Sequence, residues 1–288
     1  MKNSGWIILD KPSGMSSRAA GGRIARMLGI KKFGHLGTLD PMASGVLPIA
    51  FFEATKMIPY LEEAPQKEYE FSVQWGTCTD TDDITGRVLE QNDMAPTHAQ
   101  IAAAIPKLIG EIDQVPPAYS AVHIDGVRAY KLAVAGKPVE IPPRRVRIYN
   151  LEYLGENNFK VQCGAGTYVR SLARDIGALA GGFLATCTAI RRTRTHDFYI
   201  KDAVSLDFLE NLYNNAPQSV QDYLMPTDFG LDDILVAELN GYDAASFQNG
   251  GFIQSNGNGL RRVYNDSKLI GIGEIKDNLL RPLRIIKQ

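Results

Sequence analysis

The order of strand-like and helix-like segments limits the fold of this sequence more than any other feature. Residues 6–9 and 46–52 are short apolar runs, and residues 69–75 alternate between apolar and polar side chains, so all three indicate strands. Helical patterns occur at residues 17–28, 97–108 and 167–180. Because strands and helices do not follow each other in a βαβ rhythm, the sequence favours an α+β fold over a doubly wound parallel sheet.

The length of 288 residues indicates two domains, or one large domain with a small one attached. The chain changes character near Pro226, after which short β-like runs dominate, such as residues 262–264 and 283–286. Asn265-Asp266-Ser267 between two of these runs is typical of a hairpin turn. We therefore expect a large domain over residues 1–226 and a small, β-rich domain over residues 227–288.

Composition excludes several classes of protein. Apolar residues make up 44% and charged residues 22%, as in ordinary globular chains. No apolar stretch is long enough to span a membrane, and Asp10 and Lys11 interrupt the place where a signal peptide needs its apolar core. The three cysteines form no CxxC motif and cannot all pair, which indicates a reduced, cytoplasmic protein without a structural zinc site.

Charge is distributed in alternating blocks, although the formal net charge is only −1. Residues 1–56, 128–201 and 261–288 carry net charges of +5, +8 and +4, whereas the two intervening blocks carry −9 each. A fold that brings the basic blocks together would present a positive face to a polyanion. Unrelated solvated faces would explain the same pattern equally well.

The most concentrated functional signal is the loop Gly34-His35-Leu36-Gly37-Thr38-Leu39-Asp40-Pro41, directly before an apolar strand. Glycine allows tight backbone turns, and Pro41 disfavours a helical conformation at Asp40. Such a loop can present a carboxylate from a rigid edge. An ordinary turn in which Asp40 bonds to its own backbone remains open at this point, and the Walker-type phosphate motif is absent.

Three further segments are weaker candidates. The loop 79–86 is rich in Asp and Thr, but it lacks the glycine and glutamate positions of an EF-hand, so we interpret it as a turn or an RNA-facing segment. Arg170 near the start of a helix and the cluster 191–194 could bind anions or could be surface charge. The four histidines are scattered and show no metal-ligand spacing.

The run from Gly34 to Pro48 closely resembles the catalytic motif of the bacterial tRNA pseudouridine-55 synthases, the TruB family. The resemblance covers nearly the whole chain, because residues 11–17, 67–69, 76–86, 116–121 and 166–170 also fit family motifs in order. Residues 269–274 with 280–282 resemble the small RNA-binding PUA-like domain.

Membership of this family implies a pseudouridine-synthase fold, with a mixed, mainly antiparallel central sheet flanked by helices. It implies isomerisation of a flipped-out uridine at position 55, in the T-loop of tRNA, without a metal or other cofactor. The C-terminal domain would then contact the acceptor stem, and the protein would be a monomer in the cytoplasm.

The resemblance also implies site residues. Asp40 would be the catalytic carboxylate, kept ionised by Arg170. Tyr69 would stack on the base, and its phenol would take part in transfer of the proton at C5. Substrate-binding positions complete the expected site: Tyr168, Ile190, Lys11, His35 and Asp83. We expect Tyr168 and Ile190 to wall the pocket, Lys11 to support that wall, His35 to stack against the T-loop, and Asp83 to hydrogen-bond to it.

Three positions depart from the family pattern, namely His123, Val134 and His196, where Lys, Arg and Gly are common. They affect expected RNA contacts rather than the chemistry. Two other functions remain possible from the sequence: a tRNA-binding folding chaperone in which catalysis is secondary, and a hydrolase that uses Asp40 on a nucleoside bond. No motif supplies the water-activating carboxylate that the hydrolase would need.

Overall fold

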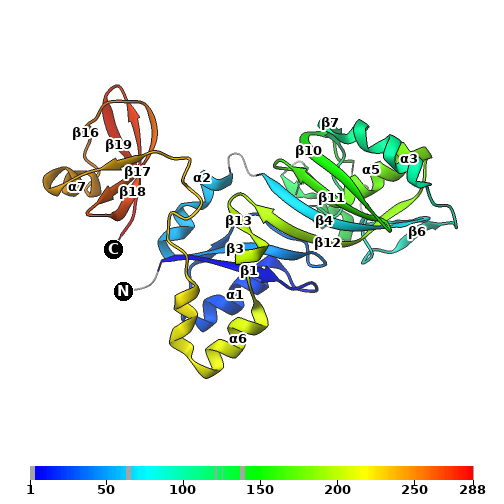
Figure 1. The fold of residues 1–288 in the computed structure, drawn as a ribbon, viewed down its shortest axis with the longest axis horizontal. Helices are drawn as coiled ribbons and strands as arrows, with labels where there is room; N and C mark the ends of the chain where they lie inside the picture. The colour runs from blue at the N-terminus through cyan, green and yellow to red at the C-terminus, as the bar shows by residue number, and fades with distance from the viewer. Residues whose placement is uncertain (1–3, 63–65, 121, 125, 137–139, 288) are drawn as a thin grey trace.

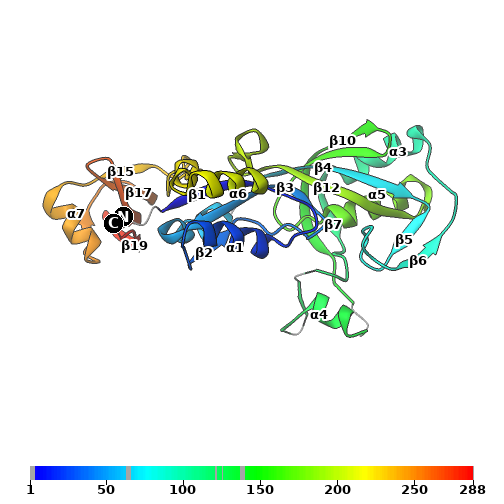
Figure 2. The same cartoon turned by 90° about the horizontal axis from the view of Figure 1, so that it is seen from below.

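The computed structural model describes residues 4–62, 66–120, 122–124, 126–136 and 140–287. This part of the chain forms a ten-stranded sheet and, near the C-terminus, a separate five-stranded sheet. Figure 1 shows the small sheet at one end of an elongated molecule, and Figures 1 and 2 both place the two chain ends close together on that side.

The large sheet is mixed and mainly antiparallel, as expected. Among the described strands of this sheet, two neighbouring pairs are parallel: β1 with β14, and β3 with β12. The strands lie in this order: β14 (Val204–Ser205), β1 (Gly5–Lys11), β3 (Ser44–Phe51), β12 (Ala185–Thr195), β4 (Lys67–Trp75), β11 (Asn158–Cys163), β10 (Arg144–Gly155) and β7 (Gly110–Gln114). β2 (Phe33–His35) also pairs with β3, and β13 (Phe198–Tyr199) pairs with β12.

The burial of side chains along β4 confirms the strand predicted from the alternating apolar and polar residues 69–75. Tyr69, Phe71 and Val73 are buried, whereas Glu70 and Gln74 are exposed. Phe71 stacks on Phe159 of the neighbouring strand with a centroid distance of 5.2 Å. Such cross-strand apolar pairs fix the register of a half-buried sheet, so β4 presents Tyr69 on the covered face.

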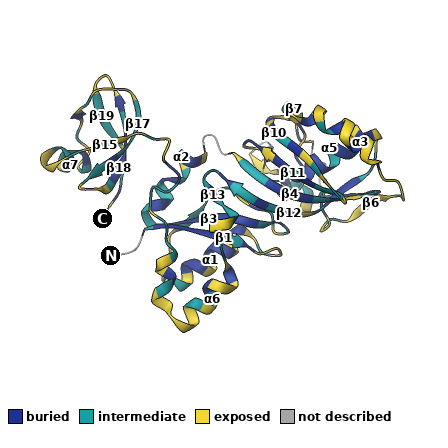
Figure 3. Ribbon diagram, in the orientation of Figure 1, coloured by how far each residue is buried: buried dark blue, intermediate teal, exposed yellow. Residues whose placement is uncertain are grey.

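Helices lie against the large sheet with one face buried and one exposed (Figure 3). Helix α1 (Ser17–Met27) begins where Ser16 accepts a hydrogen bond from Ala19 N. A capping box of Thr97 and Gln100 starts α3 (His98–Ala104), within the helical pattern predicted over residues 97–108. Helix α5 (Val169–Gly181) ends at Gly182, whose φ of 82° is left-handed.

The remaining helices of the large domain are α2 (Ile58–Glu62), α4 (Ala129–Val134), α6 (Leu206–Asn215) and the 3₁₀ segments Phe52–Lys56, Ile105–Leu108, Ile200–Asp202 and Pro217–Tyr223.

Two local expectations need correction. Residues 34–41 are interpreted above as a loop, but Gly34 and His35 belong to the short strand β2. Residues 46–52 are predicted above as a strand, and a proline favours the start of a strand or a bulge, yet Pro48 lies in the middle of β3. Along that edge of β3, β2 covers residues 49–51 and β12 covers residues 44–45. Pro48 lies between them, where no strand requires its missing N–H.

Two small hairpins extend from the large sheet. β5 (Thr77–Thr79) pairs with β6 (Val88–Gln91), and β8 (His123–Ile124) pairs with β9 (Val127–Arg128). Figure 2 shows that the segment carrying α4 projects away from the body of the protein.

The C-terminal sheet confirms the expected small, β-rich domain. Its order is β15 (Val236–Glu238), β17 (Gly259–Asn265), β18 (Lys268–Lys276), β19 (Leu279–Ile285) and β16 (Ile253–Gln254). Asp266 and Ser267 have positive φ angles at the hairpin between β17 and β18, as the turn signal indicated. Helix α7 (Gly241–Gln248) was not expected from the sequence.

The small domain is attached to the large one by polar and apolar contacts. Lys56 Nζ donates to the carbonyl of Ile285 at 2.7 Å, and the backbone N–H of Lys287 donates to Glu53 at 3.0 Å. Ile272 and Ile286 belong to the same buried cluster as residues of β1 and β3. The segment 226–235 connects the two parts before β15 begins. Within the described ranges, no helix is both long and apolar enough to cross a membrane.

Candidate active site

A cavity of about 400 Å³ lies where the 34–45 loop meets β4 and the start of α5. This volume falls in the range of roughly 300–1,000 Å³ that is typical of small-molecule sites. Five of the residues expected from the sequence line it, namely Asp40, Tyr69, Tyr168, Arg170 and Ile190. The other lining residues are Thr38, Leu39, Ala43, Lys67, Tyr119, Ser120, Tyr130, Gly166, Thr167 and Val169.

The loop that carries Asp40 is held by α1 and by the turn after β1. Ser17 Oγ donates to the carbonyl of Leu39 and accepts from its N–H, both at 2.9 Å. The N–H of Gly14 donates to the carbonyl of Pro41 at 2.8 Å. These contacts lie on either side of Asp40, so its backbone position is fixed before any ligand binds.

Lys11 supports the same loop from beneath. Its side chain is fully buried, and Nζ donates to the carbonyls of Pro12 and Met15 at 2.8 and 2.7 Å, with Pro41 at 3.4 Å. Burial lowers the pKa of Lys11 to about 8, the nearby Asp40 opposes this, and the Arg192 charge adds to it. Lys11 does not line the cavity, so its place is behind the site.

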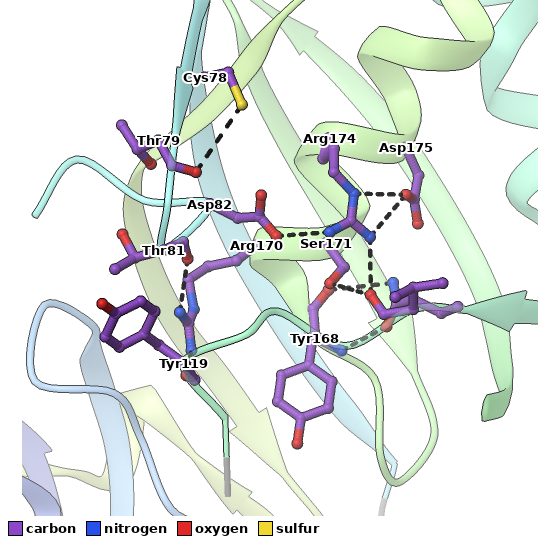
Figure 4. A network of polar contacts seen from close by, with 12 residues as sticks. Cys78, Thr79, Thr81, Asp82, Tyr119, Tyr168, Arg170, Ser171, Arg174 and Asp175 are labelled. Carbon is purple, nitrogen blue, oxygen red and sulfur yellow. Dashed lines mark hydrogen bonds and ion pairs between the residues drawn. The ribbon is translucent and has the colours of Figure 1, made fainter. Parts of the chain in front are cut away.

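Arg170, at the start of α5, reaches across the cavity wall. Its Nε lies 2.9 Å from Asp40 Oδ2, which confirms the expected contact between the two side chains. Nη1 donates to the carbonyl of Thr81 at 2.8 Å and Nη2 to that of Tyr119 at 3.1 Å (Figure 4). The guanidinium is only 4% exposed, whereas Asp40 is 39% exposed, so the carboxylate faces the opening.

Asp83 lies behind Arg170 rather than toward the cavity. Its Oδ2 is 3.3 Å from Arg170 Nη1, and the side chain is 5% exposed. Oδ1 accepts hydrogen bonds from the hydroxyl and the N–H of Thr85 at 2.6 and 2.9 Å, and from the hydroxyl of Thr81 at 3.0 Å. The expected hydrogen bond from Asp83 to a substrate loop does not fit this place, because both oxygens already have protein partners.

A second arginine ties the same acidic loop to α5 (Figure 4). Arg174 Nη1 lies 2.7 Å from Asp82 and Nη2 lies 3.2 Å from Asp175. Burial raises the pKa of Asp82, and the Arg174 charge opposes that rise. The 79–86 loop, rejected above as an EF-hand, is therefore a hydrogen-bonded support for the helix that carries Arg170.

Tyr69 lines the cavity from β4, together with Asp40. The ring is only 7% exposed, and burial raises the pKa of its phenol to about 12, against the opposing charge of Arg192. Tyr168 directly precedes α5, with its N–H and carbonyl both bonded to Gln114. Ile190 projects from β12 as an apolar wall.

His35 lies on β2 near the loop but outside the cavity lining. Burial lowers its pKa, and the positive charges of Arg192 and Arg18 lower it further. Its Nδ1 has no hydrogen-bond partner among the described residues. An imidazole that is neutral at physiological pH suits stacking better than ion pairing.

The sequence reasoning missed Arg192 and Lys67. The cluster 191–194 was interpreted as basic surface or anion site, but Arg192 is fully buried. Arg191, beside it, is partly exposed and pairs with Asp10 at 2.7 Å. Strand alternation from the inward-facing Ile190 could have indicated that Arg192 points the same way. Lys67, two residues before Tyr69 on β4, lines the cavity, and burial lowers its pKa.

The three departures from the family pattern lie away from the cavity. His123 and Val134 are exposed, on β8 and α4. His196 has a φ of 54° in the turn between β12 and β13, a left-handed conformation that glycine adopts more easily. This explains why a glycine is common there. Across the described ranges, no group of three or more His, Cys, Asp or Glu side chains could hold a metal ion.

Comparison with known proteins identifies the class of enzyme to which this site belongs. Residues 25–169 match the model of the TruB family pseudouridylate synthase N-terminal domain, and residues 236–286 match that of the pseudouridine synthase II TruB C-terminal domain. The chain is therefore a pseudouridine synthase, an isomerase.

Full-length relatives specify the family. Proteins named tRNA pseudouridine synthase B from Bradyrhizobium diazoefficiens and Ehrlichia ruminantium are each 40% identical over 295 residues, and both alignments cover 98% of this chain. They cover 85% and 98% of those relatives. One from Ehrlichia chaffeensis is 41% identical, with 98% of both chains covered. This chain belongs to the TruB family.

Solved structures share the fold at lower sequence identity. A chain of an H/ACA RNP bound to a substrate RNA containing 2′-deoxyuridine superposes with a TM-score of 0.72 at 22% identity, covering 99% of this chain and 85% of that one. A Cbf5–Nop10–Gar1 complex gives 0.72 at 23% identity, covering 98% and 84%. These similarities confirm the α+β fold across both sheets.

Proposed function

We propose that this enzyme converts the uridine at position 55, in the T-loop of tRNA, to pseudouridine, with Asp40 as the catalytic carboxylate. One observation carries the proposal: Asp40 is held 2.9 Å from Arg170 at the open edge of a cavity that also contains Tyr69. The relatives named tRNA pseudouridine synthase B support tRNA as the substrate.

The reaction breaks the N1–C1′ bond, turns the uracil and joins C5 to C1′. Asp40 either attacks C1′ or removes a proton from the sugar after the bond has broken. Both routes need an ionised carboxylate at a fixed place, and the bonds at Leu39 and Pro41 hold its backbone there.

The uridine must leave the stacked T-loop to reach this cavity, at a cost of a few kcal/mol. Tyr69 offers a ring for the base to stack on, a contact worth roughly 1–3 kcal/mol. Tyr168 and Ile190 form apolar walls beside it. Because Asp40 is 39% exposed in the free protein, bound RNA has to cover it to keep water from the reactive sugar.

Residues around the cavity then have supporting roles. Lys11 holds the Asp40 loop, and Asp83 holds Arg170 instead of contacting RNA directly. His35 remains our candidate for stacking against the opened T-loop. No redox cofactor is needed, because nothing is oxidised and no group is gained.

The small domain is our candidate for the contact with the acceptor stem. Its surface carries Phe252, 59% exposed, with the guanidinium of Arg281 over the ring at 5.4 Å. An exposed aromatic–arginine pair suits stacking and phosphate contacts. A cytoplasmic monomer remains our expectation, and the free thiols of Cys78, Cys163 and Cys187 agree with a reducing compartment.

One assay distinguishes this function from its rivals. The protein is incubated with unmodified tRNA and with the same tRNA carrying cytidine at position 55, and the nucleosides are analysed. Pseudouridine from the first RNA alone supports the proposal. Free uracil would indicate the hydrolase, and neither product, with tRNA still bound, would indicate a binding chaperone.

A further inference from the structure

A buried arginine connects the two halves of the site. Arg192 on β12 is fully buried; its Nε donates to the carbonyl of Val46 at 2.8 Å and its Nη2 to that of Gly37 at 2.9 Å. These two carbonyls lie before and after Asp40 in the chain. Arg192 therefore holds both ends of the loop that presents the carboxylate.

The charge of Arg192 has no balancing carboxylate. Among the residues that the structure describes, none forms an ion pair with it, and its Nη1 has no hydrogen-bond partner. A Cβ at Gly37 would lie 2.9 Å from Nη1, so the glycine leaves room for this group. Burying an uncompensated positive charge is costly, so its retention points to a negative charge that forms beside it during function.

Tyr69 is an ionisable group beside Arg192 that can become negatively charged. The two residues are register partners on the antiparallel strands β4 and β12, so their side chains share one face of the sheet. Burial raises the pKa of the Tyr69 phenol to about 12, and the positive charge of Arg192 opposes that rise. The other charged or titratable groups acting on this phenol are Cys163 of β11 and Asp40.

We propose that Arg192 is a positioning residue for the isomerisation, whose guanidinium orients the Tyr69 phenol and stabilises a transient phenolate there. The inference rests on the proposed function, because it assigns a step within that reaction. Arg192 does not line the cavity and acts through Tyr69.

The proton transfers balance without an external acid or base. The phenol gives its proton to N1 of the detached uracil and becomes a phenolate beside Arg192. The C5–C1′ bond then forms with the electron pair of the C5=C6 double bond. If Asp40 has attacked C1′, the Asp40–C1′ bond breaks and its electron pair returns to the carboxylate; if Asp40 has removed a sugar proton, that proton returns to the sugar. The phenolate removes the C5 proton, the C–H electron pair restores the double bond, and the phenol is regenerated. Net, one proton moves from C5 to N1.

The test uses tRNA with deuterium at C5 of uridine 55, with kcat and the C5 isotope effect measured for Arg192→Lys and Arg192→Gln. We expect kcat to fall at least about tenfold and the isotope effect to rise, because loss of a proton-transfer partner slows that step selectively. Arg191→Lys, one position away and paired with Asp10, is the matched control and leaves both values unchanged.

A double-mutant cycle adds a second criterion. In a Tyr69→Phe background, Arg192→Lys should lower kcat much less than in the wild type, because the hydroxyl through which it acts is already gone. A loss of kcat with the wild-type isotope effect would overturn the proposal, since Arg192 would then only hold the loop. The proposal would also be overturned if the two substitutions lowered kcat additively in the double mutant, or if Arg192→Lys left kcat unchanged in the wild-type background.

A measurement on the intact arginine covers the case in which the Arg192 variants do not fold. In protein labelled with ¹⁵N-arginine, Tyr69→Phe should shift the guanidinium signal of Arg192 and leave that of Arg191 in place. An unmoved Arg192 signal would overturn the proposal. Pseudouridine formation by the wild type is scored separately, so failure of the proposed function is distinguished from failure of this step.

Discussion

Nε of Arg170 lies 2.9 Å from Oδ2 of Asp40, although one residue begins a helix and the other belongs to a loop far earlier in the chain. The same guanidinium lies 3.3 Å from Asp83. One buried cation thus bridges an exposed carboxylate at the cavity and a buried carboxylate behind it. This arrangement fixes the orientation of Asp40 without removing it from the opening.

Replacing Asp40 with Asn should abolish pseudouridine formation and leave tRNA affinity within about tenfold of the wild type, because the amide keeps the shape and loses the charge. Turnover on unmodified tRNA and binding by filter retention measure the two effects. Activity near the wild-type rate would remove Asp40 from the mechanism.

Two substitutions of Tyr69 separate stacking from proton transfer. Tyr69→Phe keeps the ring, so it should bind tRNA normally and turn over slowly. Tyr69→Leu should also weaken binding, by about tenfold to hundredfold, because a stacked base contributes roughly 1–3 kcal/mol. Single-turnover rates and dissociation constants provide the comparison, and a wild-type rate for Tyr69→Phe would exclude a role for the phenol.

Asp83→Asn tests the carboxylate behind Arg170. We expect unfolding to become easier by about 1–3 kcal/mol and kcat to fall while tRNA affinity stays, since Arg170 loses a buried charge partner. Urea unfolding and steady-state kinetics provide the readouts. Asp113→Asn is the control: its carboxylate is 61% exposed in a surface pair with Arg145, which contributes little. Equal effects of the two substitutions would contradict the prediction.

The lowered pKa of Lys11 predicts that the stability of the protein depends on pH. Its pKa is about 8 in the folded protein and 10.5 ordinarily, so above pH 8 the unfolded chain binds more protons. The free energy of unfolding should therefore rise from pH 7 to 9.5, by roughly 1–2 kcal/mol more in the wild type than in Lys11→Met. Urea titrations at several pH values test this, and parallel pH curves for the two proteins would refute it.

Gly45→Ala should be strongly destabilising. Gly45 has a φ of 102°, and a Cβ there would lie 2.2 Å from the carbonyl oxygen of Arg192. Backbone must move, so we expect a loss above about 2 kcal/mol. Gly29→Ala is the matched control, because its φ is 65° and its Cβ would meet nothing within 4 Å. Thermal unfolding of the two variants is compared. Gly45→Ala combines a steric clash with backbone strain, whereas Gly29→Ala has the backbone strain alone.

Local patterns in the sequence determined the fold class, several element boundaries and the loop that carries Asp40. The alternation of residues 69–75 predicts β4, and the capping box at Thr97 predicts the start of α3, because neighbours in sequence set these signals. The positions of α7 and β2 escaped this reasoning. Helix α7 lacks a side-chain cap, and β2 is only three residues long.

Only the tertiary structure decided which charges meet. Strand alternation places Arg191 and Arg192 on opposite faces, but only the tertiary structure shows that Arg192 is the buried one and Arg191 the partly exposed one. Irregularities in the β4–β12 register contribute to which side chains face inward. Asp83 turns toward Arg170 because the 79–86 loop packs against α5. Sequence specifies each segment through short-range preferences, whereas distances between segments depend on the packing of the whole sheet, and the chemistry of the site depends on those distances.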